Sequence, residues 1–255
     1  MKPEIDFAGR AYLGTRQTQQ DYYAFWPVFG DEHDSQKILM VLADGMGGGA
    51  DGAEASRMAV EAFIEAFQMF TGSIESNDGM ALRESLDAAN RSMLLLKDAG
   101  TGESGTTLVA ATITSSLLQW ISVGDSALFL LRGNRLERLN ADHSMRPVVE
   151  ARVAAGELTA HESATVSGRN HLRSALTGTE LDLIDFSPKP FRLRPGDTIL
   201  CATDGMECVD PREIVKISVE TRNSGAAETA QRLISCVKNL ERRGQDNATI
   251  AIVIP

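Results

Sequence analysis

Cysteine is scarce in this chain of 255 residues, which holds three, at Cys201, Cys208 and Cys236. An odd count with no CxxC spacing suits neither a disulfide framework nor a zinc site. A reducing, cytoplasmic location is therefore expected. Long apolar runs are also lacking, because no stretch reaches the ~20 apolar residues that a membrane helix needs. Residues 1–10 lack the apolar core of a secretory signal, so we expect no membrane segment.

Positive charge is the second shortage. Lys and Arg number 25 against 35 Asp and Glu, which gives a net charge of −10. The densest basic run is the short segment 241–244, so nucleic acid is not an expected partner. The 43% hydrophobic and 24% charged content is that of an ordinary globular protein. Because the chain also lacks repeats, low-complexity tracts and Pro/Ser-rich linkers, we expect one domain over residues 1–255.

Hydrophobic periodicity predicts the elements of the first third. Apolar runs at 22–29 and 37–44, with a polar segment between them, predict a β-hairpin. Apolar residues at helical spacing over 55–70 and 82–96 then predict two amphipathic helices that follow one another. A hairpin followed by a helix pair is typical of a sheet that is covered on one face.

The middle and end of the chain are richer in strands. Apolar runs at 106–114, 117–123 and 127–132 predict strands joined by tight turns, and 248–255 predicts a closing strand. A further amphipathic helix is expected over 227–240. Strands gathered into sheets with paired helices indicate a layered α/β fold with largely antiparallel pairing.

Capping residues and a weakly patterned segment complete the local predictions. Asn77 or Asp78 is available as N-cap of the second helix, and Ser224 is the expected N-cap of the last. From Asp142 to Gly178 the pattern weakens into a short helical stretch and polar loops. A segment of that length between regular elements favours a functional flap at about 142–178.

Four aspartates stand in segments that packing alone does not explain. Asp44 and Asp204 each follow an apolar run and precede a glycine, Asp246 comes just before such a run, and Asp21 precedes the hairpin. Strands deliver terminal carboxylates to the edge of a sheet, where carboxylates that converge need a cation. Ligation by oxygen alone points to Mg²⁺ or Mn²⁺. Taken singly, each aspartate could instead form a turn or cap a helix.

At these residues the chain resembles the metal-dependent serine/threonine protein phosphatases of the type 2C (PPM) family, in its bacterial form. The resemblance runs from about residue 7 to residue 253, with six motifs in the family's order. They are GTRQTQQD (14–21), ADGMGG (43–48), SGTTLVAATI (104–113), VGDSALFLLRGNRLERLNADHS (123–144), ATDGM (202–206) and QDNATIAIV (245–253). The resemblance implies a central antiparallel β-sandwich flanked by helix pairs.

The resemblance also implies hydrolysis of phosphoserine and phosphothreonine in proteins by a hydroxide that two metal ions activate. Asp44, as the carboxylate that bridges both ions, would act in catalysis together with Asp204 and Asp246, which complete the shell of one ion. The Gly45 carbonyl is a further expected ligand. Asp21 would hold the second ion through ordered water. Mg²⁺ or Mn²⁺ is expected as the cofactor.

For two further residues, the role that the resemblance implies stands beside a simpler structural role. Asp125 would bind a third, weaker ion alongside Asp204, or it only caps the turn between two strands; the residues favour neither interpretation. Arg16 is implied to clamp the substrate phosphate, since a guanidinium offers a planar fork to two phosphate oxygens. Without Asp21 nearby, Arg16 would be read as a surface arginine.

The proton donor is the point at which the chain departs from some family members. Those members carry a histidine directly after the Asp-Gly of the first metal turn, and this chain has Met46 there, so water is the expected donor. His143 is expected to order a loop. Cys236 and Arg242 have the spacing of a cysteine phosphatase, but CVKNLER lies on a predicted helix and lacks the glycines of a phosphate-binding loop.

The implied partners are phosphorylated proteins and a cognate serine/threonine kinase. A second hypothesis is a catalytically weak or dead family member that acts as a regulatory binding scaffold. Such a protein should have lost metal-binding aspartates, and this chain keeps them all. A third is a phosphatase dedicated to one regulatory partner, which the sequence does not separate from a general one.

Overall fold

The computed structural model describes residues 5–28, 36–48, 50–71, 78–98 and 104–255. Two sheets form its centre, and every pairing between their strands is antiparallel. The five-stranded sheet has the order β1 (Asp6–Tyr12), β12 (Ala248–Ile254), β11 (Thr198–Ala202), β7 (Ala127–Arg132) and β8 (Arg135–Arg138). The seven-stranded sheet has the order β10 (Phe191–Arg192), β6 (Leu117–Val123), β5 (Leu108–Ile113), β3 (Lys37–Met46) and β2 (Asp21–Val28), with β4 (Gly105–Thr106) beside β3 and β9 (Asp185–Phe186) beside β6.

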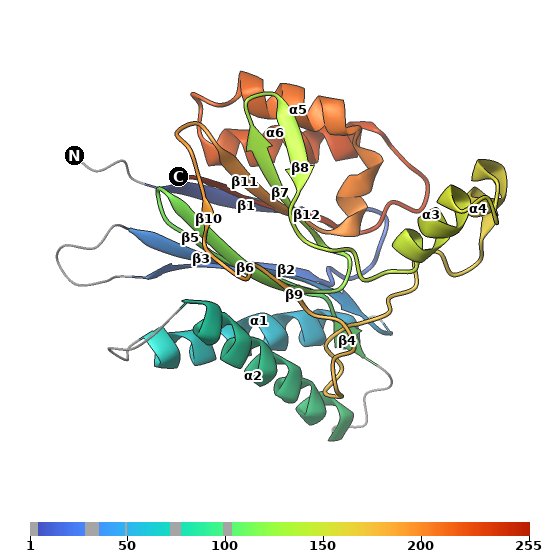
Figure 1. Cartoon of the computed structure of the whole chain (residues 1–255), viewed down its shortest axis with the longest axis horizontal. Coiled ribbons are helices and arrows are strands. Elements are labelled where there is room, and N and C mark those ends of the chain that lie inside the picture. The colour runs from blue at the N-terminus through green and yellow to red at the C-terminus, as the bar shows by residue number, and fades with distance from the viewer. Residues whose placement is uncertain (1–4, 29–35, 49, 72–77, 99–103) are drawn as a thin grey trace.

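Helix pairs cover the outer faces of both sheets. Helices α1 (Ala50–Thr71) and α2 (Asp78–Asp98) pack on the seven-stranded sheet, and α5 (Pro211–Glu220) and α6 (Ala226–Asn239) pack on the five-stranded sheet (Figure 1). The predicted antiparallel β-sandwich flanked by helix pairs is therefore confirmed. No helix in the described part of the chain is both long and apolar enough to cross a membrane.

Strand β3 shows why the central runs are apolar without alternation. Its side chains point to opposite faces in turn, and both faces are covered. Leu39 and Val41 pack toward α1 and α2, whereas Met40 and Leu42 pack into the layer between the sheets. A strand that is buried on both faces carries its terminal Asp44 to the end of the sandwich on a rigid support.

Helix boundaries differ from the predictions at two places. The structure has Gly225, with φ 91°, as the N-cap of α6 and no side-chain cap from the preceding residues, so the prediction of Ser224 was wrong. Asp6 instead accepts a hydrogen bond from the Ala226 N–H at 2.7 Å. For α2, Asp78 is the first helical residue, and the alternative cap Asn77 lies outside the described residues.

Helix α5 was not predicted, although its start carries clear signals. Asp210 is its N-cap and accepts a hydrogen bond from the Arg212 N–H, and Pro211 occupies the first helical position. The helix is short, with 10 residues, and the only helix expected after residue 178 was that over 227–240. It completes the second helix pair, so the omission changed the element count and not the architecture.

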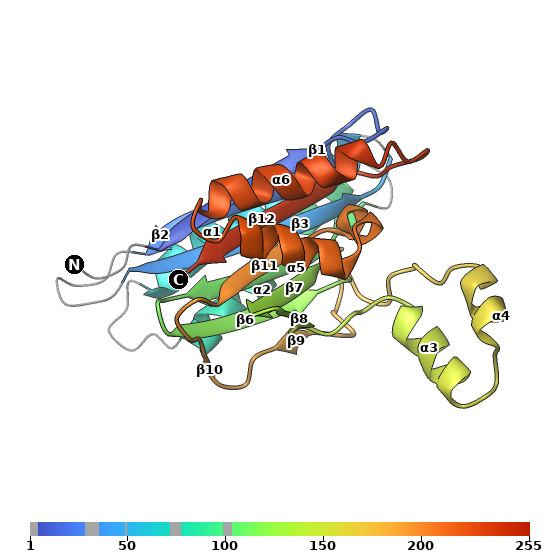
Figure 2. The same cartoon turned by 90° about the horizontal axis from the view of Figure 1, so that it is seen from above.

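Residues 142–178 hold two short helices, α3 (Arg146–Ala154) and α4 (Ala160–Thr165), that stand off from the sandwich (Figure 2). Thr159 and Glu162 form a reciprocal capping box at the start of α4. Val149 is the buried member of α3, and α4 has no buried residue. Helices α3 and α4 are thus held by local hydrogen bonds more than by a shared apolar core.

Candidate metal centre

Five aspartates from both sheets meet at one end of the sandwich. Asp44, near the end of β3, is paired in register with Asp21, the first residue of β2. Asp204 begins the 3₁₀ helix η1 (Asp204–Cys208) just after β11, and Asp246 lies two residues before β12. Asp125 occupies the turn between β6 and β7. The topology, and not sequence proximity, brings these carboxylates together.

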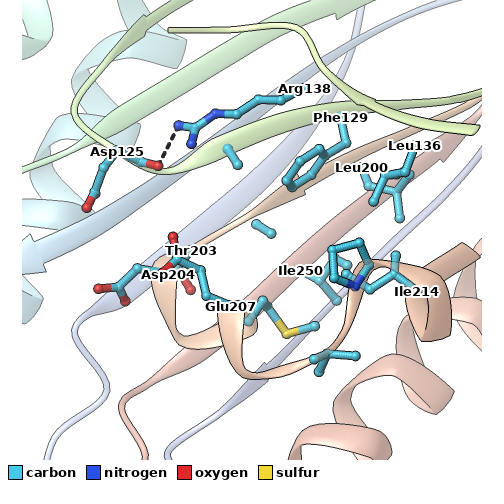
Figure 3. Close-up of a pocket in the computed structure, with 15 residues that line it drawn as sticks. Asp125, Phe129, Leu136, Arg138, Leu200, Thr203, Asp204, Glu207, Ile214 and Ile250 are labelled. Atoms are coloured by element: carbon cyan, nitrogen blue, oxygen red, sulfur yellow. Dashed lines mark hydrogen bonds between the residues drawn. The ribbon is translucent and has the colours of Figure 1, made fainter. Parts of the chain in front are cut away.

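Most of the predicted site residues line one cavity of about 580 Å³. They are Arg16, Asp44, Gly45, Asp125, Asp204 and Asp246. Asp21 is not part of the lining. It lies opposite Asp44 on the neighbouring strand, with 5% of its surface exposed. Figure 3 shows the Asp125 and Asp204 side chains on the same side of a neighbouring pocket that both residues help to line.

Burial disfavours the ionised form of these carboxylates. It raises the pKa of Asp44 well above its usual range, and repulsion by Asp21 and Asp204 adds to the shift. Burial likewise raises the pKa of Asp21 to about 6 and that of Asp204 to about 7. Concentrated charge of one sign with raised pKa values is typical of sites that bind a cation or transfer protons.

Two arginines supply part of the compensating charge. Arg16, from the loop between β1 and β2, lies 2.7 Å from an Asp246 carboxylate oxygen, and both side chains are partly exposed. Arg146, at the start of α3, lies 3.2 Å from Asp125 and also pairs with Glu207. Burial raises the pKa of Asp125, and Arg146 opposes that shift. Neither arginine pairs with Asp44.

The residues present fit a pair of hard divalent cations. The side chains expected to bind a cation here are all carboxylates and therefore offer only oxygen. Oδ1 of Asp21 is buried without a hydrogen-bond partner. Among the described residues, no three His, Cys, Asp or Glu side chains are grouped tightly enough to hold an ion unaided. Mg²⁺ is usually held by one or two carboxylates and keeps several waters, so it does not require three close side chains.

Glycines after two of the aspartates are required by close backbone contact. A Cβ atom on Gly45 would collide with the Gly52 carbonyl, and one on Gly205 would collide with the Asn247 carbonyl. Only glycine allows these approaches. The two Asp-Gly pairs therefore mark places where the chain must pass tightly beside another segment as it delivers a carboxylate.

Several polar residues that hold the aspartates were not singled out from the sequence. Thr107 Oγ1 accepts the Asp44 N–H at 3.0 Å, and Thr203 Oγ1 donates to Asp21 at 2.9 Å. The Asn247 side chain accepts the Gln20 N–H at 2.7 Å. Thr203 and Asn247 directly adjoin Asp204 and Asp246 in sequence, which is the signal that could have found them.

The predicted flap supplies one wall of the cavity through Asn170, His171 and Leu172. No pattern in the sequence pointed to these three residues. Met46 lines the cavity as well. His143 is buried, and its Nδ1 accepts the Gly124 N–H at 3.2 Å, which fits the loop-ordering role expected of it. Burial lowers the pKa of His143.

The cysteines do not line the cavity. All three are free, and burial raises the pKa of each thiol. Cys236 lies on α6, in a helix with no phosphate-binding loop. A thiolate nucleophile is therefore disfavoured by position and by protonation state.

Known proteins share the sequence pattern of this chain. A family profile described as protein phosphatase 2C matches residues 8–245. The chain is 30% identical over 225 residues to the serine/threonine phosphatase stp of Listeria welshimeri, and the match covers 87% of this chain and 86% of that protein. It is 30% identical over 220 residues to the serine/threonine protein phosphatase PstP of Mycobacterium tuberculosis, covering 84% of this chain and 40% of that protein.

Solved structures give the same result for the fold. The crystal structure of the Mycobacterium tuberculosis serine/threonine phosphatase PstP/Ppp matches with a TM-score of 0.75 and 26% identity, over 98% of both chains. A structure of the PstP catalytic domain in complex with two manganese ions matches with a TM-score of 0.74 and 25% identity, over 98% of this chain and 97% of that chain.

Proposed function

This chain belongs to the protein phosphatase 2C family, and we propose that it hydrolyses phosphoserine and phosphothreonine in proteins at the cavity around Asp44. As a member of that family it is a metal-dependent phosphatase. The observation that carries the proposal is the convergence of Asp44, Asp125, Asp204 and Asp246 from both sheets on one cavity. Because the metal-binding aspartates are all retained, the scaffold hypothesis has no support.

Two divalent cations, Mg²⁺ or Mn²⁺, are the proposed cofactors. Asp44 and the Gly45 carbonyl, with Asp204 and Asp246, would hold them, and Asp21 would hold the second ion through ordered water. When bound, the ions would offset the carboxylate charge, polarise a phosphoryl group and lower the pKa of water. The two manganese ions of the related PstP structure support Mn²⁺ as one usable metal.

A third ion at Asp125 and Asp204 remains a separate proposal. Both residues line the cavity, which supports it. Arg146 competes for Asp125 through their 3.2 Å ion pair. Such an ion would therefore bind more weakly than the first two, because it has to displace a guanidinium.

The chain's own residues have distinct tasks in the proposed reaction. Arg16 binds two oxygens of the substrate phosphate, exchanging its contact with Asp246 for the ligand. Asn170, His171 and Leu172 close the cavity on the flap side and restrict the approach of the substrate. Met46 carries no proton to donate, so the leaving oxygen takes its proton from water.

The remaining proposals concern the setting of the enzyme. Residues 1–255 are proposed to form a single catalytic domain, with the flap at about 142–178. Phosphorylated proteins are its partners, and a cognate serine/threonine kinase would supply them. A cytoplasmic location is supported by the three free cysteines.

Hydrolysis of p-nitrophenyl phosphate and of a phosphothreonine peptide, with Mn²⁺, with Mg²⁺ and with EDTA, tests the function. We expect turnover of both substrates that EDTA abolishes and that added Mn²⁺ restores. Asp44→Asn should lose this turnover, whereas the matched control Asp87→Asn, which removes one carboxylate from the exposed face of α2, should keep it. A folded protein that binds the phosphopeptide but turns over neither substrate with either metal would favour the scaffold hypothesis instead.

A further inference from the structure

The densest basic run of this acidic chain lies beside the catalytic cavity. Arg242 and Arg243 line a groove of about 430 Å³, together with Cys208, Gly244 and Gln245. The groove shares Asn170, Asp204 and Asp246 with the cavity. A ligand that places a phosphate in the cavity can therefore extend directly along these arginines.

The loop that carries the arginines is fixed in place. The Gln245 carbonyl accepts both the N–H and the hydroxyl of Thr15, at 2.9 and 3.0 Å, which ties the loop to the segment that holds Arg16. The buried Gln245 amide donates to the Gly205 carbonyl at 3.0 Å, which ties it to η1. Glu241 adopts φ 44°, a conformation that costs a non-glycine residue energy.

The charges in the groove are unevenly compensated. Among the acidic residues of the lining, Asp246 pairs with Arg16, and Glu207 pairs with Arg146. Within the described residues, no carboxylate lies within ion-pair distance of Arg242 or Arg243, their neighbour Glu241 included. Arg242 instead lies beside the Cys208 thiol, whose pKa it lowers against the effect of burial. Two guanidinium groups are thus available to an anion.

We propose that Arg242 and Arg243 bind a second phosphate on the substrate, so that this phosphatase prefers proteins phosphorylated at two nearby residues. The inference rests on the proposed function, because the first phosphate occupies the cavity. A phosphate dianion offers three oxygens, which two adjacent guanidinium forks can share, whereas a carboxylate offers two oxygens and one charge. A ligand that spans the cavity and the groove can make both phosphate contacts at once.

The test compares matched peptides. Each contains one phosphothreonine, with a second threonine two to five residues away on either side that is unmodified, phosphorylated or replaced by glutamate. We expect kcat/KM for the wild-type protein with Mn²⁺ to be roughly tenfold higher for the best doubly phosphorylated peptide than for its singly phosphorylated form. The glutamate peptide should show little of this gain.

The double variant Arg242→Gln/Arg243→Gln should lose this preference. The control Arg212→Gln/Arg232→Gln removes the same charge from α5 and α6, where neither residue lines the cavity or the groove, and should keep it. An unchanged ratio in the first variant, an equal loss in the control, or a full gain with glutamate would overturn the inference. Absence of turnover on all of the phosphorylated peptides would instead refute the proposed function.

Discussion

Asp44 experiences both desolvation and repulsion by the other carboxylates of the site. It is half-buried, is paired in register with Asp21, and is repelled by three further carboxylates. In the metal-free protein its ionised form is therefore disfavoured, and a pair of divalent cations removes the cause. The same charge that weakens the metal-free fold would hold the metals, so function and stability compete at this residue.

Asp44→Asn should lower kcat about 1,000-fold or more, since an amide cannot neutralise two cations as a shared carboxylate does. Removal of the repulsion should also raise the melting temperature in EDTA, by about 2–4 °C for each kcal/mol gained. Turnover of p-nitrophenyl phosphate at saturating Mn²⁺ and thermal unfolding measure the two effects. Near-normal turnover would refute the assignment of Asp44 as the bridging ligand.

Arg16 can act on the substrate or on Asp246, and kinetics separate the two roles. If it clamps phosphate, Arg16→Ala should raise KM for a phosphopeptide, with kcat/KM falling about 10- to 100-fold and a smaller loss in kcat. The Mn²⁺ concentration that gives half-maximal activity should stay unchanged. Arg16→Lys keeps the charge without the fork and should recover only part of the loss. An unchanged KM with weaker Mn²⁺ binding would make Arg16 a positioning residue for Asp246.

Sequence reasoning found the site residues whose immediate neighbours in the chain form a recognisable pattern. Asp44 and Asp204 each stand between an apolar run and a glycine, and the structure explains both glycines by close backbone contact. Arg146 and Asn170 have no such mark. From the flap, Asn170 lines the cavity and Arg146 contacts Asp125, through a chain path that only the tertiary structure defines.

At the scale of elements, the flap has an outer part, formed by α3 and α4, and an inner edge, formed by residues 170–172. Helices α3 and α4 stand off from the sandwich, and α4 buries no side chain. Residues 170–172, by contrast, line the cavity. Few buried groups depend on the outer part, so it should tolerate change, whereas the inner edge belongs to the site.

Replacing Ala151–Ser167 by a Gly/Ser linker of equal length should lower kcat/KM on a phosphoprotein by roughly tenfold or more. The rate on p-nitrophenyl phosphate should change little, because residues 170–172 and the aspartates remain. Circular dichroism checks that the variant is folded. An equal loss on both substrates would place the outer flap in the catalytic centre itself.

Periodicity predicted long elements better than short ones. Helices α1 and α2 present a sustained apolar stripe, and both were expected. Helix α5 has 10 residues, too few for a sustained apolar stripe, and it was not expected. The predicted cap of α6 was wrong because Asp6, from the far end of the chain, accepts the hydrogen bond that Ser224 was expected to accept. Such long-range capping has no local signature.

At the scale of the whole molecule, the site is a seam between the two sheets. Asp21 and Asp44 come from the seven-stranded sheet, while Asp204 and Asp246 flank strands of the five-stranded sheet. Repulsion across the seam acts against the packing of one sheet on the other. Cations bound there would link the sheets, so metal binding should stabilise the entire sandwich.

The pH dependence of stability should therefore reverse when metal is added. The pKa values of Asp21 and Asp204, about 6 and about 7, exceed the ordinary value of 3.8. The folded protein thus holds more protons than the unfolded chain between about pH 4 and pH 7, so these groups stabilise it at low pH and lose that contribution as pH rises. In EDTA, the melting temperature should fall from pH 5.5 to pH 8.

With saturating Mn²⁺ it should instead rise or stay level over that range, because the ligands must lose their protons to bind the cation. Asp204→Asn should flatten the slope measured in EDTA, while Asp87→Asn, on the exposed face of α2, should leave it unchanged. Thermal unfolding followed by circular dichroism at each pH measures all three proteins. A melting temperature in EDTA that rises steadily to pH 8 would mean that the buried carboxylates are already stabilised as anions by the protein alone, and the electrostatic case for a cation at this seam would fail.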